Sequence, residues 1–182
     1  KHRDYGKYNI HTYVNRNGKM VYLNEIAVDV KASGTITISN VDSQTGSFDV
    51  TISNITAPRG LTKVYVPTWT EAGGQDDIRW YVANRQANGT YKTTVQTSNH
   101  KNGLGVYQVH LYYEYSNGQI EGIATTQTSL SNQGSIKVSN LNQQAGSFDL
   151  IISNVSAITS IKSVKVPVWT EVGGQDDIHW HT

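Results

Sequence analysis

The residues best suited to chemistry lie in one short polar segment. Glu71, Asp76 and Asp77 bring three carboxylates into a glycine-containing connection, with Gln75 beside them. Paired carboxylates are what glycoside hydrolysis requires. The alternative is structural, because adjacent glycines allow a turn and Asp side chains bond local amides. We expect the structural role, since a loop between two strands offers neither the groove nor the raised pKa that catalysis needs.

The same segment returns roughly 100 residues later without a gap, a period typical of repeat proteins. Trp69–Trp80 corresponds to Trp169–Trp180, and the repeated polar residues are Glu171, Gln175, Asp176 and Asp177. A catalytic site is usually single, whereas a feature repeated at a fixed period is more often structural or adhesive. We therefore expect no enzyme active site and no cofactor.

Metal binding is the other chemistry these residues suggest. Calcium takes oxygen ligands from Asp side chains, but the spacing here matches no known calcium loop. His179 and His181 place two imidazoles on one side of a strand, yet the corresponding residues of the earlier copy are Arg79 and Tyr81. Two histidines do not complete a coordination sphere. We expect no metal site.

The elements that carry this segment follow a repeat frame. Gly105–Tyr112 resembles Gly6–Tyr13, so residues 1–32 form the C-terminal part of one repeat. Residues 33–132 then form a complete repeat and 133–182 the N-terminal half of a third. We expect a segment of a longer repeat protein.

Two arrangements of the terminal parts stay open. Each part carries unpaired strand edges and part of a core, which would allow the terminal parts of different chains to pair. The other possibility is that the structural frame is offset, with two domains meeting near Tyr81–Ala83. That boundary would cut a strand containing Ile78, Trp80 and Val82.

Composition restricts the class of protein. The 182 residues include no Cys, so neither disulfides nor zinc thiolates can support the fold. With 15 basic and 14 acidic residues the formal charge is +1, which argues against a nucleic-acid partner. No apolar run is long enough to predict membrane insertion.

Turn signals and β-branched runs predict seven strands in the complete repeat. This number of short antiparallel strands in roughly 100 residues indicates an immunoglobulin-like sandwich. The fold class we expect is all-β, with tandem immunoglobulin-like antiparallel β-sandwich repeats. The predicted strands are Thr35–Ser39, Ser47–Ser53, Thr62–Thr70, Ile78–Ala83, Thr90–Thr97, Val106–Tyr115 and Gln119–Thr126.

Side-chain alternation predicts the core. Val64 and Val66 share one face of their strand, whereas Tyr65, and with it Trp69, has the opposite parity. Either Pro67 marks a bulge that returns Trp69 to the core, or Trp69 stands on the wet face as an aromatic platform. The other predicted core residues are Phe48, Val50, Ile52, Tyr107, Val109 and Leu111.

Exposed aromatic side chains would make a glycan-binding surface, because their apolar faces stack on sugar rings. The candidate partner is then cell-wall peptidoglycan or another glycan. The candidate ligand-binding residues are Tyr65, Trp69, Trp80, Tyr112, Tyr115, Trp169 and Trp180.

The pattern V-P-x-W-T-E-x-G-G-Q-D-D-I-x-W, followed by Ala83-Asn84-Arg85 and Ser98-Asn99-His100-Lys101, resembles the Bsp-like repeat of group B streptococci and related Gram-positive bacteria. The resemblance covers essentially the whole chain. It implies a non-catalytic extracellular module of a secreted or cell-wall-associated protein, such as an autolysin or surface protein. The module would act as a spacer, a cell-wall binding unit or both, and the family offers no catalytic residues to carry over.

Overall fold

The chain is built almost entirely of β-strands. A computed structural model describes residues 4–182, and no helix among them is long and apolar enough to cross a membrane. Two short 3-10 turns interrupt the strands, η1 (Glu71–Gly73) and η2 (Thr97–His100). The strands are β1 (Gly6–Arg16), β2 (Lys19–Val30), β3 (Ser33–Asp42), β4 (Ser47–Thr56), β5 (Leu61–Thr70), β6 (Arg79–Arg85), β7 (Tyr91–Gln96), β8 (Gly105–Tyr115), β9 (Ile120–Leu130), β10 (Gln133–Asn142), β11 (Ser147–Ser156), β12 (Val166–Val168) and β13 (His179–His181).

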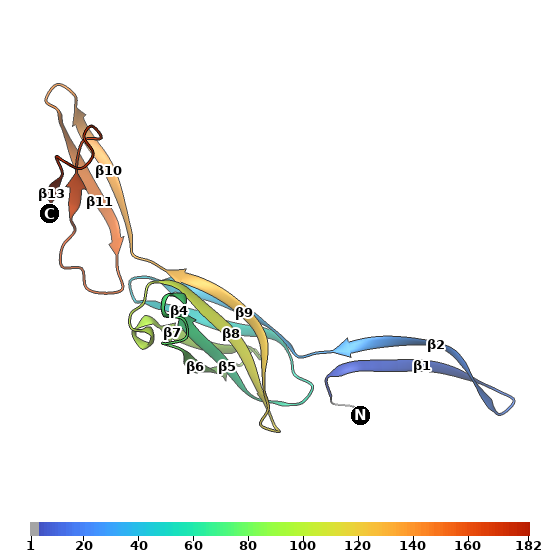
Figure 1. The fold of residues 1–182 in the computed structure, drawn as a ribbon. Helices are drawn as coiled ribbons and strands as arrows, with labels where there is room; N and C mark the ends of the chain where they lie inside the picture. The colour runs from blue at the N-terminus through green and yellow to red at the C-terminus, as the bar shows by residue number, and fades with distance from the viewer. Residues whose placement is uncertain (1–3) are drawn as a thin grey trace.

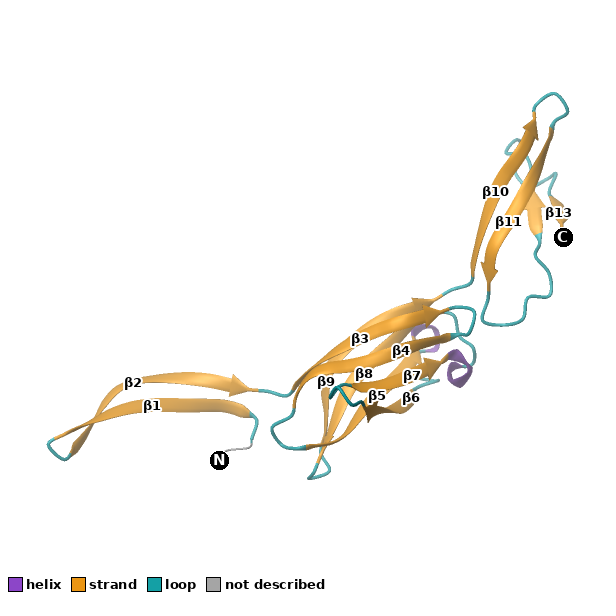
Figure 2. Cartoon of the chain, turned by 180° about the vertical axis from the view of Figure 1, so that it is seen from behind, coloured by secondary structure: helices purple, strands orange, loops and turns teal. Residues whose placement is uncertain are grey.

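Strands β3 to β9 form the central sandwich (Figure 2). One layer has the order β3-β4-β7 and the other β6-β5-β8-β9, with antiparallel neighbours throughout. A short pairing of Asn84 with Lys92 and Arg85 with Tyr91 links the layers through β6 and β7. At the opposite edges β3 lies against β9. The seven predicted strands and the sandwich fold class are confirmed.

The core lies between these two layers. Phe48 from β4 meets Tyr107 from β8 edge to face, with ring centroids 5.5 Å apart. The hydroxyl of Tyr113 crosses to the other layer and donates a hydrogen bond to the carbonyl of Ser33 at 2.9 Å. All predicted core residues are fully buried or nearly so, namely Phe48, Val50, Ile52, Val64, Val66, Tyr107, Val109 and Leu111.

Strand β5 is central, and Pro67 interrupts it without a bulge. Pairs with β8 are present at Tyr65 and again at Thr68, in the same register, but not at Pro67. Proline has no N–H to donate at that point. The expected bulge at Pro67 is therefore wrong: alternation continues, Thr68 points into the core, and Trp69 stays on the outer face.

The two terminal parts lie at opposite ends of the sandwich (Figure 1). The β1–β2 hairpin joins β3 through Lys31 and Ala32, and β9 joins β10 through Ser131 and Asn132. Strands β10 and β11 pair with each other, as do β12 and β13. The strand β6 runs through residues 81–83 without interruption.

Candidate functional site

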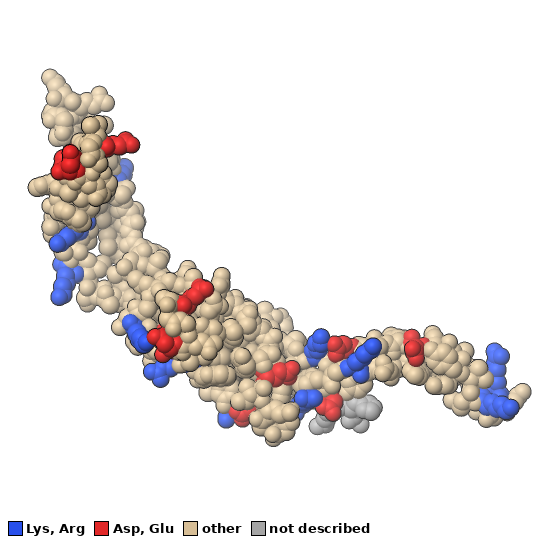
Figure 3. Space-filling view, viewed as in Figure 1, with Lys and Arg blue, Asp and Glu red and all other residues tan. Residues whose placement is uncertain are grey.

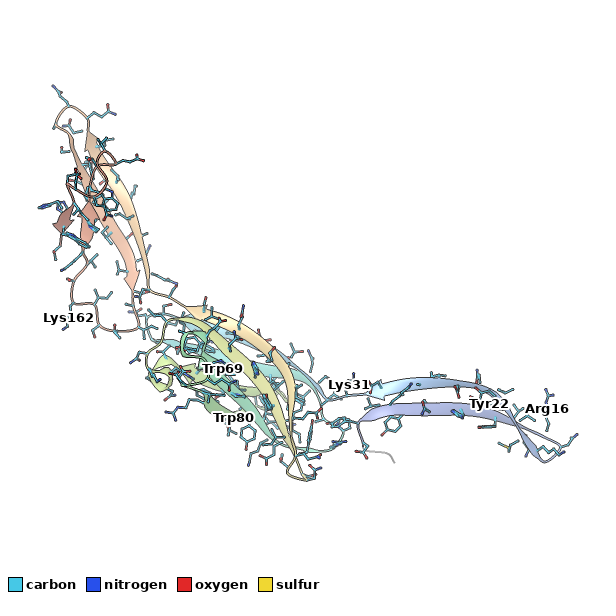
Figure 4. The ribbon with its side chains drawn as sticks, viewed as in Figure 1. Arg16, Tyr22, Lys31, Trp69, Trp80 and Lys162 are labelled. Carbon is cyan, nitrogen blue, oxygen red and sulfur yellow. The ribbon has the colours of Figure 1, made fainter. Side chains whose placement is uncertain are left out.

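The outer surface of the β6-β5-β8-β9 layer carries a cluster of aromatic rings. Alternation places Tyr65 of β5, Trp80 of β6, and His110 and Tyr112 of β8 on this surface, because the intervening residues fill the core. We call these four side chains the outer aromatic face. The labelled Trp80 and Trp69 in Figure 4 locate this part of the central sandwich.

The rings of the outer aromatic face contact one another. The ring centroids of Trp80 and Tyr112 are 5.1 Å apart, and those of Trp80 and Tyr65 are 5.9 Å apart. His110 and Tyr112 are nearly parallel, with an interplanar angle of 10°. Trp80 is 49% exposed, so a ligand can reach it. Aromatic rings that are held by their neighbours and still exposed suit stacking on a flat apolar surface.

Trp69 lies at one end of this cluster but is only 9% exposed. Its ring packs edge-on against His110, with centroids 4.6 Å apart. Burial of Trp69 was the structural alternative considered above, but its cause is packing on the outer face rather than a turn into the core. Trp69 is therefore a support for the surface and not a platform.

Tyr115 is a wrong candidate, because it belongs to the core. It is 1% exposed, and its hydroxyl donates to the carboxylate of Glu121 at 2.6 Å. Burial is the main reason that the pKa of this tyrosine is raised. The alternation that places Tyr107 and Val109 in the core also places Tyr115 there, since all have the same parity.

A shallow depression of about 440 Å³ adjoins the outer aromatic face between β8 and β9. Tyr112 stands over Gly122, and a Cβ at Gly122 would lie 3.3 Å from its ring. Because Gly122 has no side chain, the Tyr112 ring can lie this close to β9. The lining residues are His110, Tyr112, Gly122, Ile123, Ala124 and Thr125.

The charged groups near the face neutralise each other. The carboxylate of Glu114 accepts a hydrogen bond from the Tyr65 hydroxyl at 2.7 Å and pairs with the Lys63 ammonium at 3.3 Å. The hydrogen bond from Tyr65 is the largest cause of the lowered pKa of Glu114. Acidic and basic side chains also lie beside one another over the surface visible in Figure 3. A strongly charged ligand finds no matching field here.

The repeated polar loop is held by hydrogen bonds of its own. The carboxylate of Asp77 accepts from the Thr70 backbone N–H at 3.0 Å and from the Thr70 hydroxyl at 2.7 Å. Asp77 is buried, whereas Glu71, Gln75 and Asp76 are exposed. Asp77 thus closes the loop between β5 and β6, as the structural interpretation predicts.

The remaining loop residues also have structural roles. Gly74 has a φ of 63°, which favours glycine. Gly73 leaves space for the side chain of Asp76, whose carboxylate pairs with the Lys101 ammonium at 2.7 Å. The backbone carbonyls of Glu71 and Gln75 accept turn hydrogen bonds from Gly74 and Ile78.

A buried histidine forms a hydrogen bond to the backbone of the loop. His100 is fully buried, and its Nδ1 lies 3.1 Å from the carbonyl oxygen of Asp77. A carbonyl can only accept, so Nδ1 donates and Nε2 accepts from the Tyr81 hydroxyl at 2.8 Å. Burial lowers the pKa of His100, with a smaller opposing effect from the Asp77 charge. The imidazole is neutral in this arrangement.

The second copy of the loop keeps the main hydrogen bonds of the first. The Thr170 backbone N–H donates to Asp177 at 3.0 Å, and the hydrogen bond from Thr170 lowers the pKa of this carboxylate. Asp176 again stands against Gly173, and the backbone carbonyls of Glu171 and Gln175 accept the same turn bonds. The aromatic candidates Trp169 and Trp180 are 44% and 58% exposed.

Metal ligands do not converge in residues 4–182: no group of three or more His, Asp or Glu there could hold an ion. The rings of His179 and His181 lie 4.8 Å apart but have no third ligand of this kind. The carboxylate of Asp77 is already engaged by Thr70. Chemically, the loop serves as a brace.

Two residues of the surface were not recognised as such in the sequence. His110 was not among the candidate residues, although its parity with Tyr112 placed it on the same face of the strand. Gly122 carried no signal, because a glycine in a strand does not reveal which ring stands above it. The structure brings Tyr65, Trp80 and Tyr112 together and separates them from Tyr115.

Comparison with solved structures found partial likenesses. A polysaccharide deacetylase from Bacillus cereus aligns with a TM-score of 0.47 and 12% identity. A proposed polysaccharide deacetylase from Bacillus anthracis aligns with the same TM-score and 14% identity. Each alignment covers 56% of this chain and 31% of the other, too little to inform activity. The comparison with curated proteins found no match.

The comparison with protein families gave a match over most of the chain. The profile of the GBS Bsp-like repeat matches residues 37–128 and again residues 137–182. The first match spans most of the central sandwich, and the second covers most of the strands from β10 onward. The chain therefore belongs to the GBS Bsp-like repeat family.

Proposed function

We propose that this chain is a non-catalytic, extracellular repeat module of a secreted, cell-wall-associated protein of Gram-positive bacteria, which spaces other domains and binds wall glycan. The parent protein would be an autolysin or another surface protein. The observation that carries glycan binding is the outer aromatic face, where the exposed Trp80 contacts both Tyr65 and Tyr112. Aromatic rings of this kind stack on the apolar faces of sugars.

The spacer role is supported by the way consecutive parts are joined. Only Lys31 and Ala32 separate β2 from β3. At the same end, the guanidinium of Arg59 pairs with Asp4 at 3.0 Å and lies 4.5 Å over the ring of Tyr5. Short connections with contacts across them restrict the motion that a flexible linker would allow. An array of such units would hold its neighbours at a defined distance.

A non-catalytic role agrees with the use made of the carboxylates. Asp77 is bound by Thr70, and Asp76 is paired with Lys101. A general acid needs a raised pKa and a substrate groove. The carboxylates of Asp76 and Asp77 are instead engaged by partners within the protein. A dedicated carbohydrate-binding module, without a spacing role, is the alternative that the aromatic surface also supports.

Co-sedimentation with purified Gram-positive sacculi tests the proposal. We expect the wild-type chain to pellet with sacculi and Trp80→Ala to remain in the supernatant, with its fold checked by circular dichroism. Thr37→Ala, an exposed change on the other layer, is the matched control and should pellet normally. If the wild type stays in the supernatant, wall binding is wrong and only the spacer role remains.

A further inference from the structure

The depression beside Tyr112 adjoins a β-bulge. In the β8–β9 pair Leu111 faces Ala124 and Tyr112 faces Gly122, so Ile123 is an extra residue. A bulge of this kind bends its strand and re-aims neighbouring side chains. Here it places a residue without a side chain directly opposite Tyr112, and the Tyr112 ring lies close over that residue at the edge of the depression.

The β1–β2 hairpin has the same bulge, but a tyrosine stands at the position of Gly122. Its register shifts between Thr12 and Tyr13, and Tyr13 pairs with Tyr22. Tyr22 thus has the position that Gly122 has in the central sandwich. The ring of Tyr22 lies 5.7 Å from that of Tyr13 and 6.0 Å from that of His11. Tyr22, labelled in Figure 4, therefore stands where the depression would be.

The depression has the size and lining of a small-ligand site. Its volume of about 440 Å³ lies within the ~300–1,000 Å³ of ordinary ligand pockets. One wall is the Tyr112 ring, and the Thr125 hydroxyl and His110 imidazole supply polar groups. None of the described residues that line it is Lys, Arg, Asp or Glu. An uncharged ligand with one apolar face and hydroxyl groups fits this lining.

The His110 imidazole suits such a ligand. Partial burial lowers the pKa of His110, so the ring is neutral at neutral pH. A neutral imidazole has one donor and one acceptor nitrogen, as a sugar hydroxyl requires. The Trp69 ring packs against His110 at 4.6 Å and holds it in place.

We infer that the depression beside Tyr112 is a subsite for one uncharged sugar ring, open in the central sandwich and closed by Tyr22 in the β1–β2 hairpin. This inference rests on the proposed glycan binding and makes it more specific. The sugar stacks on Tyr112 while its hydroxyls bond His110 and Thr125, and the chain continues towards Trp80. The copies of the repeat thus differ in what they can bind.

The variant Gly122→Tyr tests the subsite, because it places a tyrosine opposite Tyr112, as Tyr22 stands opposite Tyr13 in the β1–β2 hairpin. The φ of Gly122 is not positive, but a Cβ there would lie 3.3 Å from the Tyr112 ring, so this ring must shift slightly in Gly122→Tyr and in Gly122→Ser alike. The Tyr13 and Tyr22 rings coexist in the same register, so we expect the variant to fold. We expect Gly122→Tyr to bind sacculi about tenfold more weakly than wild type. Gly122→Ser, with a much smaller side chain, should lose far less.

Competition defines the ligand class. Chitohexaose, an uncharged sugar oligomer, should release the wild-type chain from sacculi, whereas polyphosphate should not. Release by polyphosphate alone would overturn the uncharged class. If Gly122→Tyr is folded and binds as tightly as wild type, the subsite is wrong while the loss of binding in Trp80→Ala still supports the proposed function. If wild type does not bind sacculi, the proposed wall binding fails and the subsite fails with it, and only the spacer role remains.

Discussion

The Asp77 carboxylate bonds both the backbone N–H and the hydroxyl of Thr70, at 3.0 Å and 2.7 Å. The same relationship joins Asp177 to Thr170. A Thr followed seven residues later by an Asp therefore closes the loop in both copies. The long repeated motif encodes a brace between two strands, which explains why it recurs without a gap.

Removing this brace should destabilise the sandwich. Asp77→Ala leaves the buried Thr70 N–H and hydroxyl without their acceptor, at a cost of about 2–3 kcal/mol. Asp76→Ala removes only an exposed ion pair and should cost less than about 1 kcal/mol. Urea denaturation followed by circular dichroism measures both values. Equal losses in the two variants would contradict the assigned role of Asp77.

Calcium should have no effect on stability. Ca²⁺ needs six to eight oxygen ligands, and Asp77 is already bound by Thr70 while Asp76 is paired with Lys101. We expect the melting temperature to be the same in millimolar calcium and in a chelator. A rise of several degrees in calcium that is abolished by Asp76→Ala would show a site in this loop.

The two tryptophans of the outer surface should separate stability from binding. Trp69→Ala removes a buried ring that packs on His110 and should cost about 3 kcal/mol of unfolding free energy. Trp80 is 49% exposed, so Trp80→Ala should cost roughly 1 kcal/mol or less while removing the stacking surface. Thermal and urea unfolding of both variants test this order. A more severe loss in Trp80→Ala would reverse the assignment.

Stability should fall in mild acid because of His100. Burial lowers the pKa of His100 in the folded chain, so the unfolded chain binds a proton more readily. This contribution is fully present above the ordinary histidine pKa of about 6.5 and is lost as the pH falls below it. The melting temperature of wild type should drop more between pH 7.5 and pH 5 than that of His100→Gln.

Much of the fold was predictable from local pattern. Alternation identified Val50 and Val109 as core residues, and both are fully buried. Alternation predicts the core because successive side chains of a strand point to opposite faces of the sheet, and the face that packs in the core is apolar. The same rule, followed along β8, would have excluded Tyr115 from the candidate surface.

The sequence by itself determined the repeat, the strands and the core, because these depend on residue spacing along one chain segment. It left open whether Trp69 or Trp80 faces a ligand. Both lie on the same outer surface, and only packing against His110 from a neighbouring strand buries Trp69. The close approach of the Tyr112 ring to Gly122 likewise exists because a bulge sets this glycine opposite Tyr112. Such cross-strand relationships depend on register between distant segments, which only the tertiary structure decides.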